Sequence, residues 1–295
     1  MGPSGSHSCD PAAAMVQDDG EFDATRRSWN VATRNHNAHK GDQAARLAAG
    51  EEFLFEEELE LLGELSGRTL VHLQCNAGQD SLCLARRGAE VTGVDLSDEA
   101  IAFAQGLATA SGIDASFVRA ELVAWMRTTE RRFEVAFCSY GAVGWLPDLP
   151  AWAAGVARIL EPGGRLVYVE FHPMVWSIGE TFRLDRDDYF TREPFGDPVS
   201  DYVAASEDAL GALDEHPVPG VNEIAAPSWQ HTFAEVLDAL AHAGLRIERV
   251  REYAWANGCR VSPGLVREPG SRRWVWPAGV ARTPLMFGLV ARRDP

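Results

Sequence analysis

The alternation of apolar and polar positions is clearest between residues 69 and 97. Two short apolar runs, residues 69–73 and 90–95, flank residues 79–87, in which apolar side chains recur at helical spacing. This order predicts a strand, a turn, a helix and a second strand. Together these elements make one βαβ unit.

The same order of elements continues along the chain. Further strands are expected at residues 115–119, 135–139, 165–171, 245–250 and 285–291, and further helices at 53–65, 97–110, 148–160 and 229–244. Ser97 and Ser228 are the expected N-caps of two of these helices. Because strands and helices alternate, the pattern predicts an α/β fold with a parallel sheet, helices on both faces and right-handed crossovers.

The turn after the first strand limits the kind of nucleotide that can bind. It contains a single glycine, Gly78, and has neither the GxGxxG spacing of a dinucleotide site nor the lysine of a P-loop. The second strand ends at Asp95, about 20 residues further on, where nucleotide-binding α/β folds place an acid against ribose hydroxyls. The turn therefore suits a small nucleoside ligand better than a pyrophosphate, and argues against a nicotinamide-dependent reductase.

Four segments resemble the motif series of a known family. The segments LVHLQCNAGQD, VTGVDLSDEAI, FCSYGAVGWLPDL and EPGGRLVYVEFHP lie in the order and spacing of class I S-adenosyl-L-methionine (SAM) dependent methyltransferases of the small-molecule type, over roughly residues 69–172. The resemblance implies a Rossmann-like, seven-stranded, mostly parallel sheet with an antiparallel last strand. The sequence departs from the family at His72, Gln74 and Asn76, where an acid and two glycines are common.

The resemblance implies a set of cofactor-binding residues. Asp95 would hold the ribose, Leu96 would pack on the adenine, and Glu121 would accept the adenine amino group or serve only as a charge at a helix start. Lys40, the only lysine, would meet the methionine carboxylate. The remaining expected contacts come from Gln74, Cys75, Asn76, Gly78, Leu122 and Ser139.

Catalysis in this family needs little from the protein beyond alignment and exclusion of water. SAM already carries an activated methyl group, and its transfer leaves S-adenosyl-L-homocysteine (SAH). A nearby base would help to remove a proton from the acceptor. The candidates are His172, Tyr140 and Glu170, which lie at the ends of the fourth and fifth strands. The alternative for His172 is a purely structural role.

An acidic insertion between residues 173 and 227 bears on the acceptor. It holds twelve acids and three arginines, and it is either a solvated flap or part of the acceptor pocket, where carboxylates with Tyr189, Phe190 and Tyr202 would bind a cation. The second reading favours N-methylation of a cationic amine or guanidine compound. O-methylation of a small metabolite and a non-catalytic SAM-binding protein are the alternatives.

Composition excludes several classes of partner. The formal charge of -16 over 295 residues argues against nucleic acid and anionic membranes. The absence of a long apolar run predicts a soluble, cytoplasmic protein. A monomer or a homodimer is expected. Five cysteines without a CxxC pair indicate neither a disulfide framework nor a metal site.

One domain is expected, with several parts. Residues 1–24 are read as a disordered tail. The domain then comprises an N-terminal helical part (25–66), whose residues 25–42 form either a solvated lead-in or a lid over the cofactor, a SAM-binding core (69–172), the insertion (173–227) and a C-terminal part (228–295).

Overall fold

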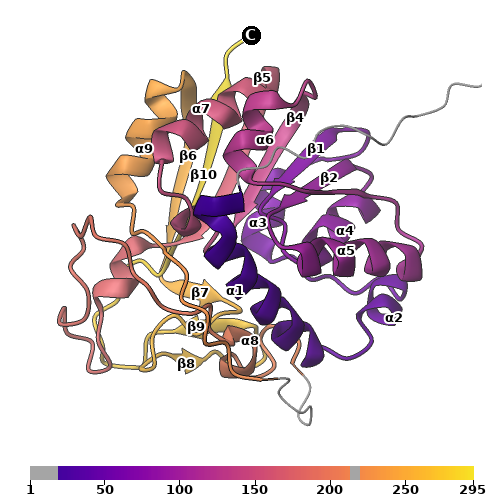
Figure 1. The fold of residues 1–295 in the computed structure, drawn as a ribbon. Coiled ribbons are helices and arrows are strands. Elements are labelled where there is room, and N and C mark those ends of the chain that lie inside the picture. Colours follow the sequence, from indigo (N-terminus) through magenta and orange to yellow (C-terminus); the bar gives the residue numbers. More distant parts are fainter. Residues whose placement is uncertain (1–18, 213–219) are drawn as a thin grey trace, which may run out of the picture.

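A seven-stranded sheet forms the centre of the molecule. The computed structural model describes residues 19–212 and 220–295 (Figure 1). The strand order is β3-β2-β1-β4-β5-β10-β6, and β10 is antiparallel to both of its neighbours. The strands are β1 (Thr69–Leu73), β2 (Glu90–Asp95), β3 (Ser116–Arg119), β4 (Phe133–Ser139), β5 (Leu160–Phe171), β6 (Leu245–Tyr253) and β10 (Met286–Arg293). The predicted fold class, with its antiparallel last strand, is confirmed.

Helices cover both faces of the sheet and bury a separate core on each. Successive residues of β1 point to opposite faces, so that Leu70 belongs to one core and Val71 to the other. The first core is covered by α3 (Glu56–Leu62), α4 (Gln79–Arg86) and α5 (Asp98–Ser111); the second by α6 (Leu122–Thr128), α7 (Leu149–Ile159) and α9 (Phe233–His242). Burial on both faces explains why β1, β4 and most of β10 are almost continuously apolar.

The strand order places a switch point at β1. The chain runs outward from β1 through β2 to β3, and then returns to add β4 on the other side of β1. At such a point the connections after neighbouring strands diverge, which leaves a crevice beyond the carboxyl ends of the strands. The candidate site lies there.

Several predicted boundaries are wrong. Helix α1 (Asp19–Ala38) includes residues 19–24, which were assigned to the tail; the rest of that tail, residues 1–18, lies outside the described part of the chain. The helix expected at 53–65 is shorter, because α3 ends at Gly63, and an extra helix, α2 (Gln43–Ala48), precedes it.

The expected N-cap at Ser228 is also wrong. Helix α9 begins after Thr232, whose hydroxyl accepts a hydrogen bond from the Glu235 amide (3.2 Å) while the Glu235 carboxylate accepts one from the Thr232 amide (2.9 Å). This reciprocal capping box satisfies two amides that a start at Ser228 would leave without partners. Residues 228–231 consequently form a loop.

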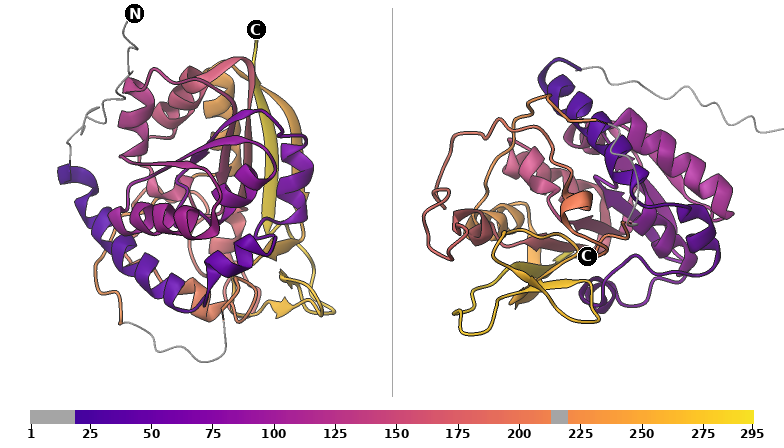
Figure 2. Two further views of the ribbon diagram at one scale, coloured as in Figure 1. Left: turned by 90° about the vertical axis from the view of Figure 1, so that its right-hand side faces the viewer. Right: turned by 90° about the horizontal axis from the view of Figure 1, so that it is seen from below.

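Three additions gather at the carboxyl ends of the strands. They are α1, the insertion with η2 (Pro173–Ser177) and α8 (Tyr202–Ala205), and a small antiparallel sheet made of β7 (Trp255–Asn257), β9 (Arg273–Val275) and β8 (Val266–Arg267). Figures 1 and 2 show all three at the same end of the large sheet. The small sheet was not predicted. Across residues 19–212 and 220–295, no helix combines the length and the apolarity needed to cross a membrane.

Candidate active site

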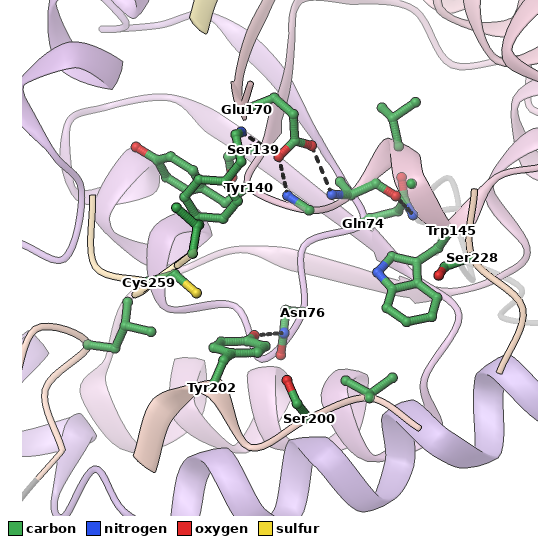
Figure 3. A pocket seen from close by; sticks show the side chains of 18 of the residues that line it. Gln74, Asn76, Ser139, Tyr140, Trp145, Glu170, Ser200, Tyr202, Ser228 and Cys259 are labelled. Carbon is green, nitrogen blue, oxygen red and sulfur yellow. Dashed lines mark hydrogen bonds between the residues drawn. The ribbon is translucent and has the colours of Figure 1, made fainter. Parts of the chain in front are cut away.

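A cavity of about 1030 Å³ opens at the switch point (Figure 3). Its floor comes from the connections that follow β1 to β5, and its walls from α1, the insertion and the loops of the small sheet. Single-ligand pockets usually measure about 300 to 1,000 Å³. The cavity therefore has room for a nucleoside cofactor together with a second small molecule.

The turn after β1 reaches its shape without the expected glycines. Gln74 (φ 53°) and Asn76 (φ 48°) both take the left-handed conformation that glycine adopts most readily. Their side chains enter the cavity, where Gln74 Nε2 donates to the Ala142 carbonyl (2.7 Å) and Asn76 Nδ2 lies 3.5 Å from the Tyr202 hydroxyl. The departure from the family pattern thus keeps the turn and adds two amide side chains to the site. Cys75 also lines the cavity.

Gly78 has a different part from the one expected. It is the left-handed N-cap of α4 and does not line the cavity. A Cβ atom at this position would lie 2.6 Å from the Cβ of Ala104 and 3.0 Å from the ring of Phe117. The glycine allows α4 to pack closely against its neighbours.

Asp95 is fixed at the end of β2. Its two carboxylate oxygens accept hydrogen bonds from the amides of Asn76 (2.8 Å) and Ser97 (2.8 Å). Burial raises the pKa of Asp95, and these amide donors counteract that rise. The oriented carboxylate lines the cavity beside Leu96 and retains free lone pairs for hydroxyl donors.

Glu121 and Leu122 lie at the end of β3 and line the same part of the cavity. Glu121 is the N-cap of α6, since its carboxylate accepts hydrogen bonds from the amides of Val123 (2.8 Å) and Ala124 (2.5 Å). The capping alternative is therefore observed. An additional contact with adenine stays a prediction.

Lys40 brings a positive charge to the wall of the cavity just after α1. Within the described residues its ammonium group has no hydrogen bond and no salt bridge. Burial lowers the pKa of Lys40 to about 8, against the attraction of Asp80. An unpaired cation in a cavity fits a ligand with an anionic group.

Two of the three predicted bases line the cavity, but neither is free to act as one. The Glu170 carboxylate accepts hydrogen bonds from the amides of Gly141, Ala142 and Phe171, which hold the loop after β4 (Figure 3). The Tyr140 hydroxyl accepts a hydrogen bond from Asn257 Nδ2 (3.0 Å), and burial with the nearby Glu58 raises the pKa of Tyr140 well above 10. Tyr140 is therefore a neutral phenol. Ser139 lies beside it in the cavity.

The structure does not bring His172 to the cavity. Its Nδ1 atom accepts a hydrogen bond from the Met174 amide (3.2 Å) and caps η2, while Nε2 lies 3.4 Å from the carboxylate of Glu252. The ring packs against Phe233 and Phe287, because the chain turns out of the sheet at Pro173. These contacts match the structural reading of His172.

Sequence reasoning missed His231, which lines the cavity in the loop before α9. Its Nε2 atom donates to the Leu146 carbonyl (2.9 Å), so the neutral ring carries its free lone pair on Nδ1. That atom has no hydrogen-bond partner in the described part of the chain, and burial lowers the pKa of His231. The capping box at 232–235 was the signal that could have placed this residue in a loop at the cavity.

Aromatic side chains from three segments also line the cavity. Trp29 of α1 and Trp145 of η1 (Val143–Trp145) meet edge to face with ring centroids 5.4 Å apart, and Trp229 lies in the loop before α9. These rings supply flat apolar surface for a ligand.

The insertion does reach the cavity, but most of its acids there are already paired. Four of its carboxylates line the wall: Asp187, Asp197, Asp201 and Asp208. Three of them have basic partners in the protein, in the pairs Asp187–Arg186 (3.2 Å), Asp201–His39 (2.8 Å) and Asp208–Arg267 (2.6 Å). The acids at 214 and 215 lie outside the described residues. Of these four carboxylates only Asp197 has no basic partner within the described part of the chain.

Among the described residues, no group of three or more His, Cys, Asp or Glu side chains is arranged to hold a metal ion. Four described cysteines, Cys75, Cys83, Cys138 and Cys259, are free thiols, and Cys9 lies outside the described part.

The sequence matches known proteins over its central part. Residues 71–164 match the family model of a methyltransferase domain. The chain is 30% identical over 107 residues to the ubiquinone biosynthesis O-methyltransferase of Alkalilimnicola ehrlichii. The aligned stretch covers 36% of this chain and 43% of that protein. The chain is 32% identical over 129 residues to an uncharacterized methyltransferase of Synechocystis sp., which covers 43% of this chain and 58% of that protein. The chain thus spans about half the length of these relatives.

Solved structures share the fold over most of the chain. A SAM-dependent methyltransferase from Mesorhizobium loti aligns with a TM-score of 0.52 and 21% identity, over 80% of this chain and 95% of that one. Another from Clostridium acetobutylicum aligns with a TM-score of 0.55 and 13% identity, over 84% and 95%. These comparisons confirm the family resemblance and the fold class predicted from the motif series.

Proposed function

We propose that this chain, which has the fold and the domain match of the class I SAM-dependent methyltransferases, transfers a methyl group from SAM to an oxygen atom of a small molecule. The observation that carries the proposal is the Asp95 carboxylate, which two backbone amides hold open to the cavity at the switch point. An acid in this place binds the hydroxyls of a ribose.

The other lining residues fit the rest of SAM. Leu96 and Leu122 offer apolar contact to the adenine, and Glu121 lies beside them. The unpaired Lys40 ammonium fits the methionine carboxylate through a charge-assisted hydrogen bond. The side chains of Gln74 and Asn76 line the same cavity.

The chemistry asks for alignment, a dry site and a proton acceptor. Bound SAM supplies a methyl group on a positively charged sulfur. Glu170 holds the loop after β4 in position, and the aromatic walls exclude water from the acceptor. His231, whose Nε2 atom donates to the Leu146 carbonyl, would accept the proton of the acceptor hydroxyl at Nδ1 as the methyl group leaves the sulfur of SAM for that oxygen and SAH is released.

Two observations favour oxygen over a cationic nitrogen as the acceptor atom. The relative from Alkalilimnicola ehrlichii is named as an O-methyltransferase, and neither relative described above is named as an N-methyltransferase. In addition, three of the four insertion carboxylates in the cavity already have basic partners. A cation would have to displace these partners in order to bind there.

The test uses SAM with a labelled methyl group and three probe acceptors: catechol, 4-hydroxybenzoate and the guanidine compound agmatine. We expect SAM and SAH to bind in calorimetry and the label to appear on the phenols. Label on agmatine alone would restore the nitrogen reading. Binding without transfer to an extended panel of alcohols and phenols would favour a SAM-binding protein without catalysis, and absence of SAM binding would refute the proposal altogether.

A further inference from the structure

The insertion reaches the cofactor side of the cavity as well as the acceptor side. The Tyr202 hydroxyl, at the start of α8, lies 3.5 Å from Nδ2 of Asn76 in the turn after β1 (Figure 3). The backbone amide of Asn76 in turn donates a hydrogen bond to the Asp95 carboxylate. The phenol therefore lies next to the turn that orients the ribose acid, and it lines the cavity.

Helix α1 holds this part of the insertion in place. The Ser200 carbonyl is bonded to Nε2 of His36 (2.9 Å), and the Asp201 carboxylate to Nε2 of His39 (2.8 Å). The ring of His36 lies 4.1 Å from the ring of Tyr202. Three consecutive residues of the insertion, at positions 200–202, thus contact His36 of α1 and His39, which directly follows that helix.

The middle of α1 is hydrogen-bonded to the residues that directly follow β2. Asn30 Oδ1 accepts a hydrogen bond from the Ser97 hydroxyl (2.6 Å), and its Nδ2 donates to Asp98 (3.1 Å). Ser97 follows Asp95 by two residues and donates its own amide to that carboxylate. Helix α1 therefore links the end of β2 to the segment that carries Tyr202, and sets the distance between them.

We propose that Tyr202 is a cofactor-contacting residue, whose hydroxyl donates a hydrogen bond to the part of SAM that lies beside Asp95 and Asn76. The inference rests on the proposed function, because it takes SAM as the ligand of this half of the cavity. It assigns the insertion a part in binding the cofactor, in addition to shaping the acceptor side. Burial raises the pKa of Tyr202, which keeps the phenol protonated and able to donate.

Calorimetry with SAH tests the inference without any acceptor. Tyr202→Phe removes only the hydroxyl and should weaken SAH binding about two- to tenfold, as one neutral hydrogen bond does. Tyr202→Leu also removes the ring and should weaken binding at least about tenfold. Tyr189→Phe is the matched control, because Tyr189 lies in the same insertion, accepts one hydrogen bond from the Phe233 amide (3.2 Å) and does not line the cavity. It should bind SAH as the unaltered protein does.

The outcomes distinguish a failure of the proposed function from a failure of the inference about Tyr202. Failure of the unaltered protein to bind SAH would refute the proposed function itself. If that protein binds SAH and Tyr202→Leu binds it equally well, only the inference falls. If circular dichroism shows that Tyr202→Leu is not folded, the SAH affinities of Tyr202→Phe and Tyr189→Phe are compared instead, and equal affinities would refute the inference.

Amide hydrogen exchange gives an independent readout. SAH should slow exchange at residues 199–205 as well as at the turn after β1. Protection at the turn without protection at 199–205 would show that the insertion does not contact the cofactor.

Discussion

At the scale of single residues, the site depends on side chains that the backbone holds in place. Asp95 is oriented by two amides, Glu121 by its cap on α6, and His231 by the Leu146 carbonyl. None of these groups needs to reorganise when a ligand enters. Preorganisation of this kind reduces the free energy lost on binding.

Asp95→Asn should weaken the binding of SAH at least tenfold. The change removes the charge that meets the ribose hydroxyls, and hydrogen bonds to charged groups contribute about 1.5 to 3 kcal/mol. Glu90→Gln, at the exposed start of the same strand, is the control and should leave the dissociation constant unchanged. Equal affinities of Asp95→Asn and the unaltered protein in calorimetry would contradict the ribose assignment.

Gly78→Ala should lower the free energy of unfolding by about 2 to 4 kcal/mol. The left-handed backbone costs about 1 kcal/mol for a residue with a side chain, and the clash with Ala104 adds an overpacking cost of about 1 to 3 kcal/mol. Gly112→Ala separates the two effects, because Gly112 (φ 70°) has nothing within 4 Å of its added Cβ. Urea unfolding of both variants gives the comparison; equal losses would mean that packing at Gly78 contributes nothing.

His231→Gln should reduce kcat about 10²- to 10⁴-fold on the best acceptor of the panel, while SAH affinity stays the same. The unaltered enzyme should lose activity as the pH falls through the pKa of His231, since the base must be neutral and burial lowers that pKa. This acid limb should vanish in the variant. His242→Gln, on the exposed end of α9, should keep both the rate and the pH profile. A retained acid limb in His231→Gln would exclude the residue as the base.

The sequence predicted the residues whose position follows from the end of a strand, and it failed where position depends on a loop. Asp95 ends the second strand of the βαβ unit, and the family resemblance added Leu96 and Glu121, which follow strand ends; all three line the cavity. His231 was missed because Ser228 was taken for the helix start, which placed it inside a helix. His172 was placed by motif register alone, which does not show that the chain turns away at Pro173.

At the scale of elements, α1 and the insertion behave as one unit although they are far apart in sequence. Asn222 Nδ2 donates to the carbonyl and the hydroxyl of Ser28 and to the Val199 carbonyl, and the Val199 amide donates to the Ser28 hydroxyl. The sequence predicted an N-terminal helical part (25–66), but it carries no information on partners so distant. The same holds for the small sheet β7-β9-β8, whose strands are too short for a clear pattern.

Asn222→Ala should loosen this unit without unfolding the sheet. The change removes an NH2 group that lies within hydrogen-bond distance of three acceptors on Ser28 and Val199. It also removes the side-chain oxygen that accepts from the Ile224 amide. Amide exchange should become faster at residues 25–38 and 199–205 and stay unchanged in β1 and β4. A change in β1 and β4 of the same size would mean that the unit is not separate from the core.

At the scale of the whole molecule, buried histidines couple stability to pH. His36 and His72 are 2% exposed, and burial lowers the pKa of His36 to about 4 and of His72 to about 3. In the unfolded chain a histidine titrates near 6.5. Below that pH the unfolded state therefore binds more protons than the folded state, which favours unfolding.

The contribution of His36 and His72 to the free energy of unfolding should be highest above pH 6.5 and fall as the pH drops towards 4. For His36 alone the loss over this range is about 2 to 4 kcal/mol. Urea unfolding at pH 7.5 and 5.0 measures it, and His36→Gln should show a smaller loss between the two pH values than the unaltered protein. An equal loss in both would place the pH dependence elsewhere.

The link between α1 and the insertion also bears on how the protein is made. Ser28 binds Val199 and Asn222, which follow it by 171 and 194 residues. On the ribosome, α1 must therefore wait until residues 199–222 have been synthesised before these binding partners exist. We expect the nascent chain to form the central βαβ units first and to gain a complete cofactor site only late in translation.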